Sequence, residues 1–170
     1  PLSVAERDGD RVYAVVIGSA VNQDGKTTVL MAPNGPSQEA VVRAAAVDAG
    51  GPHVLEELER VEAHGTGTPL GDPIEVNALA SVLGGARGSK GEGGPVRMSS
   101  AKGNFGHAEA ASGVVAIVKL AVSSLCGWVG GHVGMSRANP LLELDRHAHV
   151  VRVDEEGGAV GVAPPGWRTA

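Results

Sequence analysis

Two histidines stand in similar glycine-rich turns, each shortly after a predicted strand. His64 begins the segment HGTGTPLGDPIE, and His107 ends the segment KGNFGH. Glycines beside a polar residue allow the backbone to approach a ligand closely. The carboxyl ends of strands are where α/β sheets usually bind their ligands. Two successive turns of this kind would place both imidazoles side by side at one edge of a sheet.

Lys102 lies in the same turn as His107, five residues before it. A cation there can set the protonation of a neighbouring histidine or hold its ring in place. The residues by themselves leave two interpretations open: a paired site, or histidines that are structural or merely exposed. The other histidines lack such a setting and are predicted to be surface or structural residues: His53, His132, His147 and His149.

The segments around these turns predict an α/β layered sheet with helices packed on it. The apolar, β-branched run Arg11–Val21 is typical of a strand buried on both faces. The further predicted strands are Arg60–Ala63, Val96–Ser99, Trp128–Val133 and Val150–Val153, and the predicted helices are Ser37–Ala49, Asp72–Leu83 and Ala108–Ser124. Alternation of strands and helices in this order is the pattern of a helix-covered sheet.

Composition narrows the possible partners and the compartment. The chain has 170 residues, 42% of them hydrophobic, and a formal net charge of -5 without a block of like charges. Nucleic-acid binding is therefore not expected, because it needs clustered cations. No membrane span is expected either, because the most apolar stretch, Val114–Val122, contains Lys119 and is shorter than the roughly 20 residues required. Pro1–Asp10 does not look like a secretory leader, and the single Cys126 excludes an intrachain disulfide, so a reduced, cytoplasmic protein is predicted.

Four sequence strings occur in the order found in β-ketoacyl synthases. They are VNQDG (Val21–Gly25), APNGPSQ (Ala32–Gln38), EAHGTGTPLGDPIE (Glu62–Glu75) and KGNFGH (Lys102–His107). With these strings the chain resembles the condensing (ketosynthase) domains of type I polyketide synthases and fatty-acid synthases. The resemblance implies a thiolase-like fold, in which two α/β halves pack as five αβαβα layers. The chain would supply the C-terminal half, with a mixed five-stranded sheet.

The resemblance also divides the chain. Residues 1–10 are expected to form an N-terminal segment, residues 11–153 the β-ketoacyl synthase C-terminal domain, and residues 154–170 a poorly ordered tail. The implied reaction is a decarboxylative Claisen condensation in polyketide or fatty-acid biosynthesis. In it, an acyl thioester on the enzyme is joined to a malonyl-type extender carried by acyl carrier protein.

The family's functional residues fall on the turns described above. Its catalytic residues match His64, His107 and Lys102: two neutral imidazoles would donate hydrogen bonds to the malonyl thioester oxygen, and the lysine would orient His107 and tune it electrostatically. Thr66 and Thr68 resemble the threonines that hydrogen-bond the phosphopantetheine arm. That 4'-phosphopantetheine belongs to the acyl carrier protein, and no cofactor or metal is expected on this chain itself.

Asp72 matches a buried acidic residue that, in the family, lies behind the residues of the site and supports them. Its simpler interpretation is a helix cap, with Pro73 at the first helical position, and both can hold. Gly103 replaces the Ser or Thr that is usual after the lysine, which would loosen that turn.

The nucleophile of the family is missing from these residues. It is a cysteine in a small-residue elbow that would precede the segment present here. Cys126 follows the long apolar helix without the elbow's neighbours, so it is predicted to be a half-buried structural thiol. The family's late glycine-rich strand is also absent. The chain is therefore expected to be inactive alone and to need an N-terminal ketosynthase half, with acyl carrier protein and a second copy as further partners in the parent enzyme.

Other functions are less well supported by the sequence, and one of them remains an open alternative. The run Gly25-Lys26-Thr27-Thr28 is not a phosphate loop, because Ala20 stands where the first glycine is required. A metal site at His64 and His107 lacks further ligands at a short spacing. A thiolase is disfavoured because the long motifs are of the synthase type. A non-catalytic ketosynthase-like binding or scaffold module remains the alternative, and the acyl and extender substrates are not defined.

Overall fold

The computed structural model describes residues 1–25, 27, 33–87, 94–133, 135–153 and 158–159. Its central sheet has three parallel strands in the order β1-β2-β4: β1 (Arg60–Glu62), β2 (Val96–Ser99) and β4 (Val151–Val153). Met98 in the middle strand is paired with Val61 on one side and with Val153 on the other. The predicted α/β arrangement is confirmed, and these three strands lie close to their predicted bounds.

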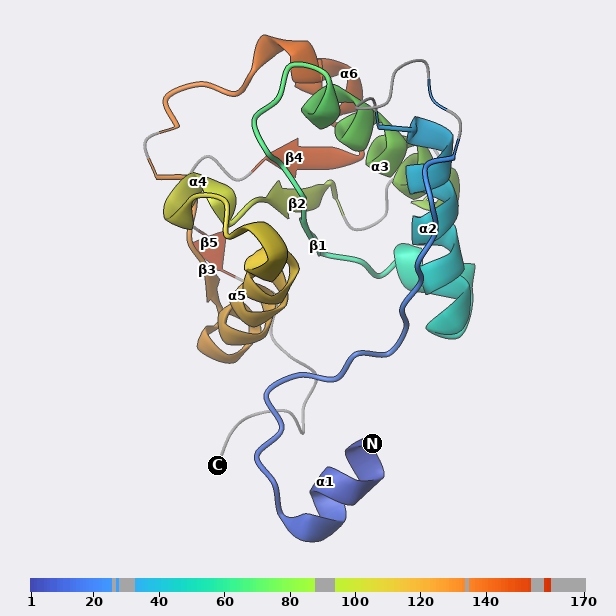
Figure 1. Ribbon diagram of the computed structural model, residues 1–170, viewed down its shortest axis with the longest axis vertical. Coiled ribbons are helices and arrows are strands. Elements are labelled where there is room, and N and C mark those ends of the chain that lie inside the picture. The colour runs from blue at the N-terminus through green and yellow to red at the C-terminus, as the bar shows by residue number, and fades with distance from the viewer. Residues whose placement is uncertain (26, 28–32, 88–93, 134, 154–157, 160–170) are drawn as a thin grey trace.

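Helices lie on both sides of this sheet (Figure 1). The longer helices are α1 (Leu2–Asp8), α2 (Gly35–Asp48), α3 (Gly71–Arg87) and α5 (Ser112–Cys126). The short ones are η1 (Pro52–Leu55), α4 (Lys102–Phe105), η2 (Glu109–Ala111), η3 (Pro140–Leu142) and α6 (Leu144–His147). Helix α2 packs beside α3, α5 lies across the sheet from them, and α1 stands away from the rest of the domain.

The two faces of the sheet differ in chemistry, because successive side chains of a strand point to opposite faces. One face carries Val96, Met98 and Val151, which are buried with residues of α3 in the hydrophobic core. The other face carries Glu62 and Ser99, which contact Lys119 of α5. The sheet therefore has an apolar side toward α3 and a polar side toward α5.

Helix α3 is longer than its sequence predicts. The pair Gly84-Gly85 suggests an end near Leu83, but the helix continues to Arg87. The Arg87 guanidinium donates hydrogen bonds to the backbone carbonyls of Leu55, Leu58 and Gly94. These contacts with distant segments hold the last turn helical, although glycine disfavours a helix locally.

The predicted strand Arg11–Val21 is wrong. Among the described residues this segment has no strand partner, and it runs as an extended chain alongside α2 (Figure 1). Several of its apolar side chains are exposed, with Val16 72%, Ile17 63% and Val21 96% accessible. An extended segment becomes a strand only when a neighbour accepts its backbone hydrogen bonds. The sequence has the composition of a buried strand, but the described residues supply no such neighbour.

The single mixed five-stranded sheet is also not formed as predicted. The strands β3 (Trp128–Val129) and β5 (Gly158–Ala159) pair antiparallel with each other and make a separate two-stranded sheet. Each is only two residues long, so β3 is much shorter than the predicted Trp128–Val133. The rest of the predicted tail, residues 154–157 and 160–170, lies outside the described residues.

Helix α5 presents a wide apolar surface to solvent. Its exposed side chains are Val114, Ile117, Val118, Leu120 and Val122. With the preceding turn, Glu109–Cys126 is long and apolar enough to span a membrane by length and composition alone, at a mean hydropathy of 1.6 over 18 residues, 6% of them buried. The stretch considered in the sequence, Val114–Val122, is only the central part of this segment. A large exposed apolar surface marks a site of protein–protein or membrane interaction or a ligand-binding groove.

Candidate active site

The structure brings His64 and His107 together. His64 follows β1, and His107 follows α4 after Gly106. The centroids of the two rings are 5.7 Å apart, and the ring planes meet at 84° in an edge-to-face arrangement. Both residues are exposed. The expectation that the two turns meet at one edge of the sheet is therefore met by the geometry.

Helix α3 fixes the turn that carries His64. The Glu75 carboxylate accepts hydrogen bonds from the backbone N–H of His64 at 2.6 Å and of Gly65 at 2.9 Å. Charge-assisted hydrogen bonds of this kind are stronger than those between neutral groups. Because both oxygens of one carboxylate are used, the backbone at His64 has a single orientation relative to α3.

Asp72 holds the same turn further along. Both of its carboxylate oxygens lie 3.1 Å from the backbone N of Gly67, which donates to them. The helix begins at Gly71, whose N–H donates to the hydroxyl of Thr68 at 3.0 Å. Asp72 thus lies inside the first helical turn and bonds back to the loop, so it is not simply the cap residue that its position before Pro73 suggests.

Gly65 allows the His64 turn to contact the next turn of the site. Its φ is +48°, and a side chain built there would place Cβ 2.8 Å from the Cβ of Ser100. The Ser100 hydroxyl donates to the carbonyls of His64 and Gly65, at 3.3 Å each. It also accepts the backbone N–H of Lys102 at 3.4 Å. Ser100, which the motifs do not single out, therefore joins the two turns.

The ring of His107 is oriented by its own chain. Its Nδ1 accepts the backbone N–H of Glu109 at 2.9 Å. In the neutral imidazole one nitrogen accepts and the other carries the proton, so Nε2 is the donor here. Glu109 holds a left-handed φ of +47°, a strained conformation that is found most often at functional sites.

The other predicted site residues occupy the same two turns. Thr66 is half-buried and Thr68 is exposed in the His64 turn, while Lys102 is half-buried at the start of α4. In the part of the chain that the structure describes, no hydrogen bond joins the Lys102 ammonium to either imidazole. The orienting role of Lys102 thus remains a prediction.

His132 also contributes to this region, although its sequence setting gives no sign of it. The backbone N–H of Ser100 donates to its Nε2 at 3.1 Å. A Cβ on Gly103 would lie 2.9 Å from the Cδ2 of the His132 ring. The missing side chain at Gly103 therefore makes room for His132, and the turn is filled rather than loosened.

We predict that Gly103→Ser, which restores the usual family residue, weakens this packing. The added Cβ would force the His132 ring off the Ser100 N–H, and overpacking of this kind costs about 1–3 kcal/mol. Urea unfolding of the chain would measure the loss. In His132→Ala the same Gly103→Ser change should cost less, because the opposing ring is gone. Equal costs in both backgrounds would contradict this account of the turn.

Two other features lie apart from the histidine pair. Cys126 is exposed at the end of α5, not half-buried as predicted, because α5 presents that side to solvent. Over the described ranges, no group of three or more His, Cys, Asp or Glu side chains is arranged to hold a metal ion.

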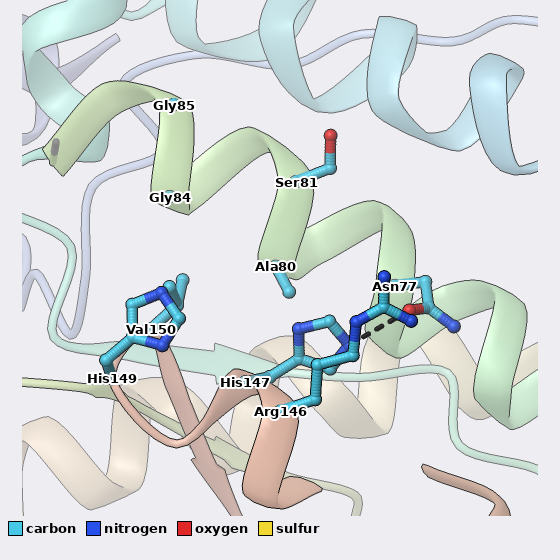
Figure 2. A pocket seen from close by; sticks show the side chains of 9 residues that line it. All are labelled: Asn77, Ala80, Ser81, Gly84, Gly85, Arg146, His147, His149 and Val150. Carbon is cyan, nitrogen blue, oxygen red and sulfur yellow. Dashed lines mark hydrogen bonds between the residues drawn. The ribbon is translucent and has the colours of Figure 1, made fainter. Parts of the chain in front are cut away.

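A pocket of about 480 Å³ lies between α3 and α6 (Figure 2). Within it, His147 Nε2 is 2.9 Å from Asn77 Oδ1. Burial, and after it the charge of Arg146, lowers the pKa of His147. The residues that line the pocket come from α3, α6 and the segment before β4, so it is separate from the candidate active site.

The site and the fold define a class: a part of a condensing enzyme that carries two histidines at adjacent turns. The family model for the beta-ketoacyl synthase C-terminal domain matches residues 13–128. The chain belongs to the β-ketoacyl synthase family, as its C-terminal domain. Its thiolase-like fold is that of ketosynthase domains.

Relatives and solved structures agree with this assignment. The chain is 46% identical over 161 residues to a polypeptide of the phenolphthiocerol/phthiocerol polyketide synthase of Mycobacterium tuberculosis, covering 94% of this chain and 8% of that protein. It is 40% identical to erythronolide synthase EryA2 of Saccharopolyspora erythraea, over 96% of this chain and 4% of that protein. A ketosynthase domain of the oxazolomycin system of Streptomyces albus superposes with a TM-score of 0.83 at 34% identity, over 99% of this chain and 29% of that one.

A second solved structure gives the same result. The ketosynthase from module 6 of the bacillaene synthase of Bacillus subtilis superposes with a TM-score of 0.84 at 32% identity. The superposition covers 96% of this chain and 28% of that chain. The chain thus spans less than a third of the ketosynthases and less than a tenth of the polyketide synthases that it matches.

Proposed function

We propose that this chain supplies the decarboxylation half of a ketosynthase active site. The observation that carries the proposal is the pair of imidazoles 5.7 Å apart, with the His64 turn held through its backbone by Glu75 and the His107 ring held by the Glu109 N–H. The complete enzyme would be an acyltransferase that performs decarboxylative Claisen condensation in polyketide or fatty-acid biosynthesis. The relatives named as polyketide synthases favour the polyketide pathway.

The two histidines are suited to stabilise an enolate. When the malonyl-type extender loses carbon dioxide, the electron pair of the broken C–C bond moves onto the thioester and leaves negative charge on its oxygen. Nε2–H of neutral His107 and an N–H of His64 would donate hydrogen bonds to that oxygen. The enolate carbon then attacks the acyl thioester, and the nucleophilic cysteine leaves as thiolate.

The remaining residues of the site would bind and support the substrate. Thr66 and Thr68 lie on the His64 turn, and their hydroxyls would hydrogen-bond the 4'-phosphopantetheine arm of acyl carrier protein. Lys102 would place positive charge beside His107 and orient it. Asp72 supports the turn through Gly67. The chain itself would bind no metal or separate cofactor.

The chain would need a cysteine-bearing N-terminal half. We infer a domain over residues 11–153, preceded by the segment 1–10, in which the exposed apolar surfaces of α5 and Arg11–Val21 face that half. Burial of these surfaces would remove their valine, isoleucine and leucine side chains from water. The parent enzyme would then be a cytoplasmic homodimer served by acyl carrier protein, and the isolated chain would be inactive.

A decarboxylation assay tests this function. Malonyl-loaded carrier protein would be incubated with the chain alone, with a cysteine-bearing N-terminal ketosynthase half alone, and with both. Loss of carbon dioxide, followed by mass spectrometry of the phosphopantetheine arm, is expected only in the mixture. A mixture containing His107→Ala chain is the matched control and should be inactive. If folded material is inactive in every combination, the chain is a non-catalytic scaffold module instead.

A further inference from the structure

A buried ion pair lies directly behind the histidine turns. Lys119 Nζ is 2.7 Å from Glu62 Oε2, and the two side chains are 12% and 1% exposed. Lys119 is the only charged residue of α5, whose other residues are apolar or small. Charged side chains are rarely buried to this degree unless they are paired. Here a lysine of a mainly exposed apolar helix reaches inward to the polar side of the sheet.

Ser99 completes the cluster. Lys119 Nζ donates to the Ser99 hydroxyl at 2.8 Å, and that hydroxyl donates to Glu62 Oε2 at 2.6 Å. The other carboxylate oxygen, Oε1, accepts the backbone N–H of Ala101. Among the described residues, no buried side-chain nitrogen or oxygen lacks a hydrogen-bond partner. A carboxylate with three donors around it has one orientation, so the cluster is rigid.

The cluster joins β1, β2 and α5, the elements that flank the two histidine turns. Glu62 ends β1, two residues before His64, and Ala101 directly precedes Lys102. Lys119 belongs to α5, which follows the turn of His107. A displacement of any one element would therefore stretch a charge-assisted hydrogen bond of the cluster.

We propose that the Glu62–Lys119 pair positions the two histidine turns for decarboxylation; the proposal rests on the function proposed above. A buried ion pair contributes little net stability compared with apolar side chains of the same volume, so stability alone does not account for it. The opposite face of the sheet is held to α3 by valine, leucine and methionine. Positioning does account for the pair, because small misplacements of catalytic groups greatly reduce rates.

The test is Lys119→Met in a complete synthase that contains this chain. The substitution keeps the length of the side chain but leaves the Glu62 carboxylate buried without a cation. The carboxylate would then turn toward water, and the Ala101 N–H would lose its partner. We expect kcat for decarboxylation of malonyl carrier protein to fall about 10- to 100-fold. KM should stay within about twofold and acylation of the cysteine should be unchanged, because neither depends on the spacing of the two turns.

Two further variants separate positioning from folding. If Lys119→Met fails to fold, the double variant Glu62→Gln/Lys119→Met removes both charges and should give soluble enzyme with the same fall in kcat. Its kcat should be no lower than that of Lys119→Met, because the same linkage is lost in both. The matched control is Arg43→Met, which removes a cation from the exposed Arg43–Glu39 pair of α2 and should leave kcat unchanged.

The outcomes distinguish this proposal from the function on which it rests. Lys119→Met enzyme as active as Arg43→Met enzyme would overturn the positioning role, and so would an equal loss of acylation and decarboxylation. His64→Ala is measured in parallel. Normal decarboxylation by that variant would contradict the proposed function itself, whatever the activity of the Lys119→Met enzyme. If the His64→Ala variant is inactive and the Lys119→Met variant is fully active, only the positioning role is contradicted.

Discussion

A complete synthase that carries His107→Ala is expected to lose malonyl decarboxylation by at least about 100-fold, the usual effect of removing one donor to a developing oxyanion. His107 presents Nε2–H because its Nδ1 is occupied by the Glu109 N–H at 2.9 Å. Alanine removes this donor, and with it the acceptor of the Glu109 N–H. Acylation of the nucleophilic cysteine should be largely intact, because in that step the negative charge develops on the oxygen of a different carbonyl. Carbon dioxide release and cysteine labelling, measured separately, would show the difference.

His64→Ala should behave in the same way, since its ring meets that of His107 edge to face and would donate to the same oxygen. Cys126→Ala is the control: the thiol is exposed at the end of α5, and its removal should change neither step. Normal decarboxylation by either histidine variant would contradict the role assigned to that residue. Loss of activity in Cys126→Ala would mean that the thiol takes part after all.

Much of the site could be predicted from sequence because its residues are close along the chain. The turns of His64 and His107 each contain their glycines and polar residues within a few positions, and parallel strands bring such turns to one edge. The contacts that tie the turns together are not local. Ser100 contacts His132, which is 32 residues away in the sequence, and Lys119 contacts Glu62, which is 57 residues away. No spacing rule along the chain identifies such pairs, so neither could be predicted.

The fold shows the same limit. The strand β2 has its predicted bounds, and the helices α2 and α5 lie within a few residues of the bounds that the apolar pattern predicts, although α2 is capped by Asn34 and begins at Gly35 and not at Ser37. Arg11–Val21 also has the composition of a buried strand, but burial and pairing depend on what lies beside it, and the described residues offer no partner strand. The end of α3 differs from its prediction for a related reason: Gly84-Gly85 is a local signal, while Arg87 is held by carbonyls from other segments.

Gly65→Ala is expected to damage the site, because the added methyl group has no room between the two turns. The new Cβ would lie 2.8 Å from the Cβ and 2.9 Å from the hydroxyl of Ser100, at a φ of +48° that alanine disfavours. Strain of this kind costs about 1–3 kcal/mol. Relief would require the His64 turn to move away from Ser100, and a displacement near 1 Å costs about 100-fold in rate. Urea unfolding and the decarboxylation assay would measure the two effects.

The matched control is Gly85→Ala in α3. A Cβ at Gly85 meets nothing within 4 Å, and its backbone is helical, so alanine should stabilise the chain by about 0.5–1 kcal/mol without changing activity. The contrast isolates the geometry of the turn, because both variants add one methyl group to a glycine. If Gly65→Ala were as stable and as active as Gly85→Ala, the turn would have to relax freely at Ser100. The close contact between the two turns would then be of no importance for holding His64 beside His107.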